Sequence, residues 1–163
     1  MPLTDAPMPQ TILLASDHAA IELKAALADW LRAEGHEVRD LGPETADRVD
    51  YPDYGYKLAT AVAADDTAVG IALCGSGIGI SIAVNRVAGC RCALVNEPLS
   101  AALAREHNDA NVGALGARMH DEATALHLAD IFVSTPFSGV ERHARRIAKL
   151  ASYEASGIVP PLT

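Results

Sequence analysis

Hydrophobic and polar residues alternate along this chain in blocks that predict strands and helices in turn. Short apolar or alternating runs, bounded by polar and glycine-containing segments, predict five strands, at residues 12–15, 37–41, 69–73, 91–95 and 112–115. Apolar spacings of three and four predict helices that follow them, from residue 16 to Gly35 and near 54–64, 78–89, 99–106, 121–133 and 141–155. This alternation predicts an α/β fold, a three-layer αβα Rossmann-like domain with a five-stranded parallel sheet.

The same pattern predicts the domain organisation. The 163 residues suffice for one domain that buries about two thirds of the surface of its unfolded chain. We expect a flexible segment at 1–11, a single domain at 12–155 and a carboxyl-terminal tail at 156–163. Either Ser16 or Asp17 is placed to cap the first helix.

Composition and charge narrow the function. Half of the residues are hydrophobic and 4% are aromatic, which is typical of helices packed on a buried parallel sheet. The net charge of −8 argues against a nucleic-acid partner, and no apolar stretch is long enough to span a membrane. Three cysteines, an odd number, favour a reducing compartment, and Cys90 and Cys92 lack the spacing of a zinc site. We therefore expect a soluble cytoplasmic protein without a metal ion.

The segment Cys74–Gly79, CGSGIG, lies between the third strand and the next helix. Ligands of parallel α/β sheets bind beyond the carboxyl ends of the strands, where this segment begins. Glycines allow successive N–H groups to point at one place, and the start of a helix favours negative charge. The segment therefore predicts an anion-binding loop with a thiol at its mouth.

Several enzyme classes compete for this loop. A dinucleotide-binding fold requires a further glycine, although Glu97 lies near the position of its ribose-binding acid. A cysteine phosphatase requires an arginine where Ile80 stands. A thiol hydrolase requires a histidine to activate Cys74, which His18 or His107 could provide. A thiolate base that moves a proton beside a carbonyl is the remaining class, because loop amides would stabilise the resulting enediolate.

Other polar residues lie at defined ends of the predicted strands. Asp17 and His18 follow the first strand and would share the edge of Cys74, whereas His107 and Asn108 precede the fifth strand. That places the latter pair at the opposite edge, so a second subunit is expected to supply them. Arg142 and Arg146 are four residues apart on a predicted helix, a spacing that suits a phosphate group.

Taken in order, these motifs resemble the type B ribose-5-phosphate isomerases and their allose- and galactose-6-phosphate isomerase relatives. The resemblance spans residues 12–155 and is carried by SDHAAIELK, DYPDY, CGSGIGISIAVNRVAGCRCALV, NEPLSAALAREHNDANV, GARM and ERHARRI. It implies an aldose–ketose isomerase that needs no metal or cofactor and acts in homodimers, or dimers of dimers, with shared active sites.

Carried onto this sequence, the resemblance assigns a role to each matching residue. Cys74 is the proton-transferring base, His107 opens the furanose ring, and Ser76 with the loop amides holds the enediolate. The substrate-binding residues are Asp17, His18, Tyr51, Gly75, Gly77, Ile78, Gly79, Asn108, Arg118, Arg142 and Arg146. Ile80 stands where some members carry a glutamate base. The expected substrate is D-ribose 5-phosphate; the alternatives are a six-carbon sugar phosphate or a non-catalytic phosphosugar-binding module.

Overall fold

The computed structural model describes residues 8–163 and contains five strands, six α-helices and a short 3-10 helix. In chain order the elements are β1 (Thr11–Ser16), η1 (His18–Ala20), α1 (Ile21–Ala33), β2 (Glu37–Asp40), α2 (Tyr51–Ala63), β3 (Ala68–Cys74), α3 (Ile78–Val84), β4 (Cys92–Leu94), α4 (Pro98–Glu106), β5 (Val112–Gly116), α5 (Glu122–Ser134) and α6 (Glu141–Ser156). Most of the predicted amino-terminal segment, residues 1–7, lies outside the described residues.

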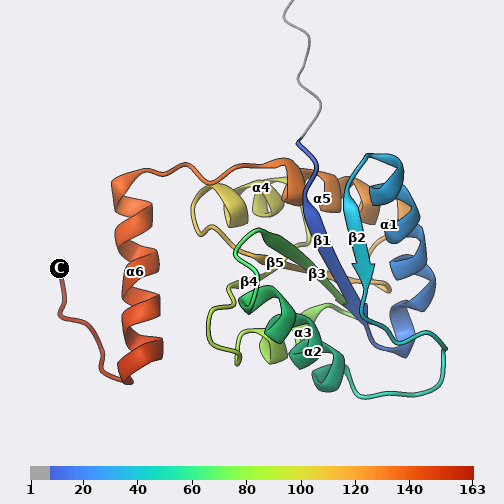
Figure 1. Cartoon of the computed structure of the whole chain (residues 1–163), viewed down its shortest axis with the longest axis horizontal. Helices are drawn as coiled ribbons and strands as arrows, with labels where there is room; N and C mark the ends of the chain where they lie inside the picture. The colour runs from blue at the N-terminus through green and yellow to red at the C-terminus, as the bar shows by residue number, and fades with distance from the viewer. Residues whose placement is uncertain (1–7) are drawn as a thin grey trace, which may run out of the picture.

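The five strands form one parallel sheet in the order β2-β1-β3-β5-β4. Helices α1, α4 and α5 pack on one face around Leu27, Leu128 and Phe132, and α2 and α3 pack on the other around Leu58 and Ile80 (Figure 1). The central strand β3 is buried along its whole length, as its continuous apolar run predicts. The predicted αβα fold with a five-stranded parallel sheet is thereby confirmed.

Besides the start of α1, which lies at Ile21 and not near residue 16, two helix boundaries differ from the expectation. Helix α3 ends at Val84 instead of near Gly89, because the Asn85 side chain pairs with the backbone of β4. Its amide nitrogen donates to the Cys92 carbonyl over 2.9 Å, and its oxygen accepts from the Cys92 N–H over 2.8 Å. Helix α2 begins earlier than expected, at Tyr51, because Pro52 is tolerated in a first turn, where its missing N–H costs nothing.

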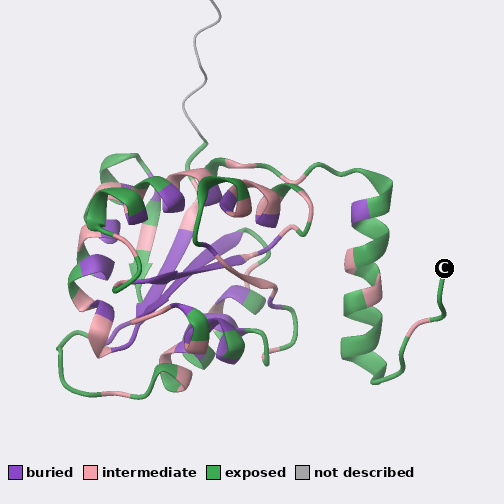
Figure 2. Cartoon of the chain, turned by 180° about the vertical axis from the view of Figure 1, so that it is seen from behind, coloured by how far each residue is buried: buried purple, intermediate pink, exposed green. Residues whose placement is uncertain are grey.

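Helix α6 lies apart from the layers of the domain (Figure 1). His143 is its one buried residue, and the helix is otherwise exposed or half-buried (Figure 2). A groove of about 680 Å³ separates its apolar side, with Ile147, Leu150 and Tyr153, from the β4 edge of the sheet. The tail folds back on α6, where Lys149 donates to the Thr163 hydroxyl over 2.7 Å.

No helix among residues 8–163 is both long and apolar enough to cross a membrane.

Candidate active site

The loop after β3 is folded around the Cys74 side chain. Cys74 is 4% exposed, and its Sγ accepts a hydrogen bond from the Gly77 N–H over 3.1 Å. The Ile78 N–H donates to the Ser76 hydroxyl over 3.2 Å. Two loop N–H groups thus donate to loop side chains. Among residues 8–163, the N–H groups of Gly75, Ser76 and Gly79 have no hydrogen-bond acceptor. Those three amides are the ones available for a developing negative charge.

Two glycines fix the shape of this loop. Gly77 has a φ of +78°, a conformation that residues with a side chain rarely adopt, and it directly precedes α3. Gly116 ends β5 beside the loop, where an added Cβ would lie only 2.5 Å from the Ser76 carbonyl carbon. Neither position accepts a side chain without moving the loop backbone, so the close packing of β5 against Ser76 depends on glycine.

Two predicted substrate-binding residues lie against the ends of the loop. A Cβ added to Gly75 would lie 3.1 Å from the guanidinium nitrogen Nη1 of Arg118. The backbone N–H of Arg118 donates to the Gly75 carbonyl over 2.9 Å. A Cβ added to Gly79 would lie 2.8 Å from Cζ of Tyr51. The guanidinium and the phenol ring therefore lie at opposite ends of the loop, in space that larger loop residues would fill.

Asp17 and His18 reach the same edge of the sheet from β1. The Asp17 N–H donates to the Leu73 carbonyl over 3.0 Å, and its carboxylate accepts from the Ala19 N–H over 2.9 Å. Asp17 therefore caps η1, and α1 begins one turn later. The His18 Nδ1 lies 3.0 Å from the Val49 carbonyl oxygen and 3.2 Å from its amide nitrogen, so the Val49 peptide orients the ring in either tautomer.

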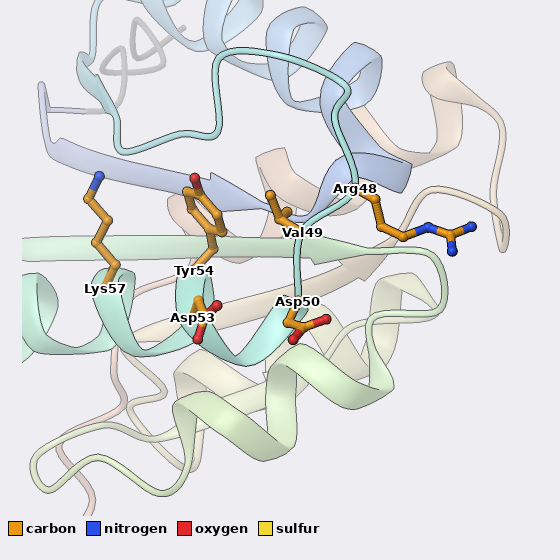
Figure 3. Close-up of a pocket in the computed structure, with 6 residues that line it drawn as sticks. All are labelled: Arg48, Val49, Asp50, Asp53, Tyr54 and Lys57. Atoms are coloured by element: carbon orange, nitrogen blue, oxygen red, sulfur yellow. The ribbon is translucent and has the colours of Figure 1, made fainter.

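A pocket of about 500 Å³ opens beside this group of residues (Figure 3). It is lined by the end of the loop that holds His18 and by the first turns of α2, with Arg48, Val49, Asp50, Asp53, Tyr54 and Lys57. The start of that loop is anchored by the buried Lys24, which donates to Asp40 and to the Pro43 carbonyl, each over 2.7 Å. The sequence does not reveal this pocket, because alternating charges on a turn-rich segment are also typical of plain surface.

The remaining cysteines and Ile80 lie outside the glycine loop, and the Cys90 thiol donates to the Ala59 carbonyl over 3.1 Å. Ile80 is fully buried between α3 and α2, where an added Gly55 Cβ would lie 3.2 Å from its Cγ1. Burial raises the pKa of Cys92 to about 12 and also raises that of Cys90. Both thiols therefore stay protonated. Among residues 8–163, no group of three or more histidine, cysteine, aspartate or glutamate side chains could hold a metal ion.

A second group of predicted site residues gathers between α4 and α6. His107 follows α4, and its ring centroid lies 4.2 Å from that of His143 on α6. Arg142 and Arg146 are exposed on the same part of α6. The exposed Asn108 lies in the turn after His107, so this second group brings together one histidine, one amide and two guanidiniums.

The turn that follows His107 is held by an arginine that the sequence analysis did not assign to the site. Arg91 donates from Nε to the Asn108 carbonyl over 3.0 Å and from Nη2 to the Asp109 carbonyl over 2.7 Å. These bonds support Asp109 at a φ of +43°, an uncommon conformation for a residue with a side chain. Only the three-dimensional fold reveals this contact, because Arg91, which directly precedes β4, and the turn after His107 are separated along the chain.

The structure does not bring the two groups together within one chain. Cys74 pairs with Gly116 at the carboxyl ends of β3 and β5, whereas Gly70 pairs with Val112 at the opposite end. His107 precedes Val112 and therefore lies at that opposite edge. One chain thus carries a thiol loop with Asp17, His18, Tyr51 and Arg118, and separately the residues His107, Asn108, Arg142 and Arg146.

Comparison with known proteins places this arrangement in a family. Residues 12–150 match the model of the family described as Ribose/Galactose Isomerase. Ribose-5-phosphate isomerase B of Mycobacterium tuberculosis is 46% identical over 152 residues, which cover 93% of this chain and 94% of that protein.

Solved structures agree with this match. A ribose-5-phosphate isomerase B of Clostridium thermocellum superposes with a TM-score of 0.88 at 42% identity, covering 91% of this chain and 100% of that one. The Mycoplasma genitalium enzyme with bound ribulose-5-phosphate gives a TM-score of 0.87 at 38% identity, covering 91% and 99%. The predicted relationship is confirmed, and this chain belongs to the ribose/galactose isomerase family.

Proposed function

We propose that this chain is a ribose-5-phosphate isomerase that interconverts D-ribose 5-phosphate and D-ribulose 5-phosphate. The observation that carries the proposal is the position of the Cys74 thiol, at the mouth of a glycine loop with Arg118 and Tyr51 at its two ends. Relatives that cover almost all of the chain carry the name of this activity. We place the enzyme in the cytoplasm, in accordance with its three unpaired cysteines.

The chemistry is a proton transfer within the sugar. Starting from the open-chain aldose, the Cys74 thiolate removes the proton from C2, and the electrons of that bond form an enediolate as the carbonyl oxygen becomes negative. The free amides of Gly75, Ser76 and Gly79 face this charge, with the Ser76 hydroxyl beside them. The proton of the C2 hydroxyl passes to the negative C1 oxygen, so that the charge now lies on the C2 oxygen. The Cys74 thiol then returns its proton to C1, a carbonyl forms at C2, and no electrons leave the substrate.

Ring opening and phosphate binding, which precede the proton transfer, depend mainly on the second group of residues. Ribose 5-phosphate is mainly a ring in solution, so the hemiacetal must open before C2 becomes acidic. We assign this step to His107, and we assign phosphate binding to Arg142 and Arg146 together with Arg118. Asp17, His18, Tyr51 and Asn108 would hold the sugar hydroxyls, and Ile78 would line the site at the start of α3.

We further propose that the active site forms between two subunits of a homodimer, alone or within a dimer of dimers. The two groups lie at opposite edges of one sheet, so a second copy of the chain has to supply one of them. Exposed apolar side chains flank both groups. Ile78 and Ile82 on α3 are 50% and 53% exposed, and Leu150 and Tyr153 on α6 are 56% and 53% exposed. Such side chains are typical of surfaces that become buried on association.

The function is tested by measuring turnover of ribose 5-phosphate, allose 6-phosphate and galactose 6-phosphate by the purified chain. The proposal predicts turnover of the five-carbon substrate at least about tenfold above the others, a discrimination within reach of pocket contacts. Preference for a six-carbon sugar would reassign the substrate. Binding of all three without exchange of the C2 proton with solvent would indicate a phosphosugar-binding module.

A further inference from the structure

Helix α6 contains a histidine that the proposed reaction does not use. His143 directly follows Arg142 and is 4% exposed, although the helix around it is exposed or half-buried. Removing an imidazole from water is unfavourable unless its ring and its nitrogens find other partners. The contacts of His143 therefore indicate what keeps it buried.

The first contact is with the ring of His107. The centroids of the two rings lie 4.2 Å apart, and the ring planes are inclined by 36°. His107 is the capping residue at the carboxyl end of α4. The two rings thus join the end of α4 to the first turns of α6, and the His107 ring cannot turn toward α6 without displacing His143.

The second contact is a hydrogen bond that fixes the His143 ring itself. Nδ1 of His143 lies 2.7 Å from the hydroxyl of Ser138, in the segment between α5 and α6. Ser138 is in turn held by its N–H, which donates to the Glu106 carbonyl over 3.0 Å. A short chain of contacts therefore runs from α4 through Ser138 to His143 and back to His107.

The charge state of His143 suits this position. Burial lowers its pKa, the positive charges of His107, Arg142 and Arg146 lower it further, and Glu106 acts in the opposite direction. A neutral ring can pack against His107 without placing a third cation beside the two arginines. His143 thus supports its neighbours by packing and hydrogen bonding.

We infer that His143 is a positioning residue that fixes the His107 ring for opening of the sugar ring, and that fixes the turn of α6 carrying Arg142 and Arg146. This inference rests on the proposed function of His107. It assigns His143 no contact with the substrate. It also explains why α6, which is otherwise exposed or half-buried, is buried at this one residue.

Two reactions of the enzyme depend differently on His107. Isomerisation of ribose 5-phosphate requires ring opening and proton transfer. Exchange of the C1 proton of ribulose 5-phosphate with solvent requires only proton transfer, because the phosphate on its C5 oxygen prevents a five-membered ring from closing on C2. A defect in His107 positioning therefore affects the first reaction more than the second at saturating substrate.

The experiment compares both reactions in His143→Ala, His143→Phe and the wild type, with the exposed His127→Ala on α5 as the matched control. Turnover of ribose 5-phosphate is measured at saturation, and C1 exchange of ribulose 5-phosphate is followed in heavy water by proton NMR. His143→Ala should lower turnover about 10- to 100-fold while exchange stays within about threefold. His143→Phe keeps an aromatic ring against His107 and should recover most of the loss, and His127→Ala should change neither reaction.

An equal loss in both reactions, or no loss in either, would overturn the positioning role of His143. If His143→Ala does not fold, Ser138→Ala must show the same selective loss at a smaller size, about threefold, because it removes only the hydrogen bond that orients the ring. An equal change of both reactions in Ser138→Ala would overturn the role as well. A wild-type chain that catalyses neither reaction would instead refute the proposed function, and the inference with it.

Discussion

The glycine loop and helix α6 carry the two groups of candidate site residues, and the protein holds them very differently. The loop is packed between β5 and α2. The Cys74 thiol accepts a hydrogen bond from the Gly77 N–H, and Gly116 lies in close contact with Ser76. Helix α6 contacts the rest of its chain through His143 and through Glu154, whose carboxylate accepts from the Gly89 N–H over 2.9 Å. The loop is therefore supported on several sides within one chain, whereas the arginines of α6 are exposed, and under the proposed function they complete the site of a second subunit. The changes below test this contrast, beginning with the largest expected effect.

Replacing the thiol of the loop should have the largest effect. Cys74→Ala should lower isomerisation about 10³-fold or more, because no other side chain of the loop can take a proton from carbon. Binding of ribose 5-phosphate, measured by calorimetry, should survive, since the phosphate contacts remain. Cys92→Ala is the control and should keep near-normal turnover, because Cys92 lies on β4 with its thiol protonated. Near-normal turnover by Cys74→Ala would exclude this residue as the base.

Adding a methyl group at the base of the loop should have the next largest effect. Gly116→Ala places a Cβ within 2.6 Å of both the carbonyl carbon and oxygen of Ser76, so the loop has to shift. We expect turnover to fall about 10- to 100-fold and stability to fall by about 1–3 kcal/mol. The control is Gly35→Ala, at a positive φ with nothing within 4 Å, which should cost about 1 kcal/mol and leave turnover intact. Thermal unfolding and steady-state kinetics of the two variants, compared side by side, decide whether the loop is as tightly packed as described.

On α6, removing one guanidinium should affect binding more than chemistry. Arg142→Ala should raise KM about 10-fold or more with a smaller change in kcat, because a charge-assisted hydrogen bond to phosphate is lost. Arg145→Ala is the matched control on the same helix. Arg145 pairs with Glu141 at 3.7 Å on the exposed surface, so its loss should change KM by no more than about twofold. Equal effects of the two substitutions would argue against a specific phosphate site at Arg142.

The smallest effect should come from acid. The pKa of His143 lies below its ordinary 6.5, so the docked ring is neutral and a released ring binds a proton more readily. Docking of α6 is therefore fully stable above about pH 6.5 and weakens as the pH falls below that value. Backbone NMR signals of α6 should report its release as the pH falls from about 6.5 to 5, and His143→Phe should remove that dependence. Release of α6 on raising the pH would contradict the assigned direction.

Much of the fold could be predicted from the sequence, because it is encoded locally. The apolar run of β3 and the alternation of strands with helices specify the sheet. The position of His107 before β5 already placed it at the edge opposite Cys74. The early end of α3 could not be predicted, because it depends on Asn85 reaching the backbone of another strand.

The parts of the site that escaped prediction depend on contacts between segments far apart in the chain. Arg91 beneath the turn after His107 and His143 against His107 are each formed by packing of separate elements. Spacing along a sequence carries little information on such contacts. His143 in particular stands between charged residues of an exposed helix, where a histidine ordinarily faces water.

The most direct test of the central claim, that each active site combines the loop of one subunit with the His107 group of another, is complementation between inactive variants. Cys74→Ala and His107→Ala chains with different affinity tags are expressed together, and complexes carrying both tags are isolated. A mixed dimer then has one site with both changes and one site with neither, so its turnover of ribose 5-phosphate should reach about half that of the wild type. Mixed dimers as inactive as either variant alone would contradict the shared site.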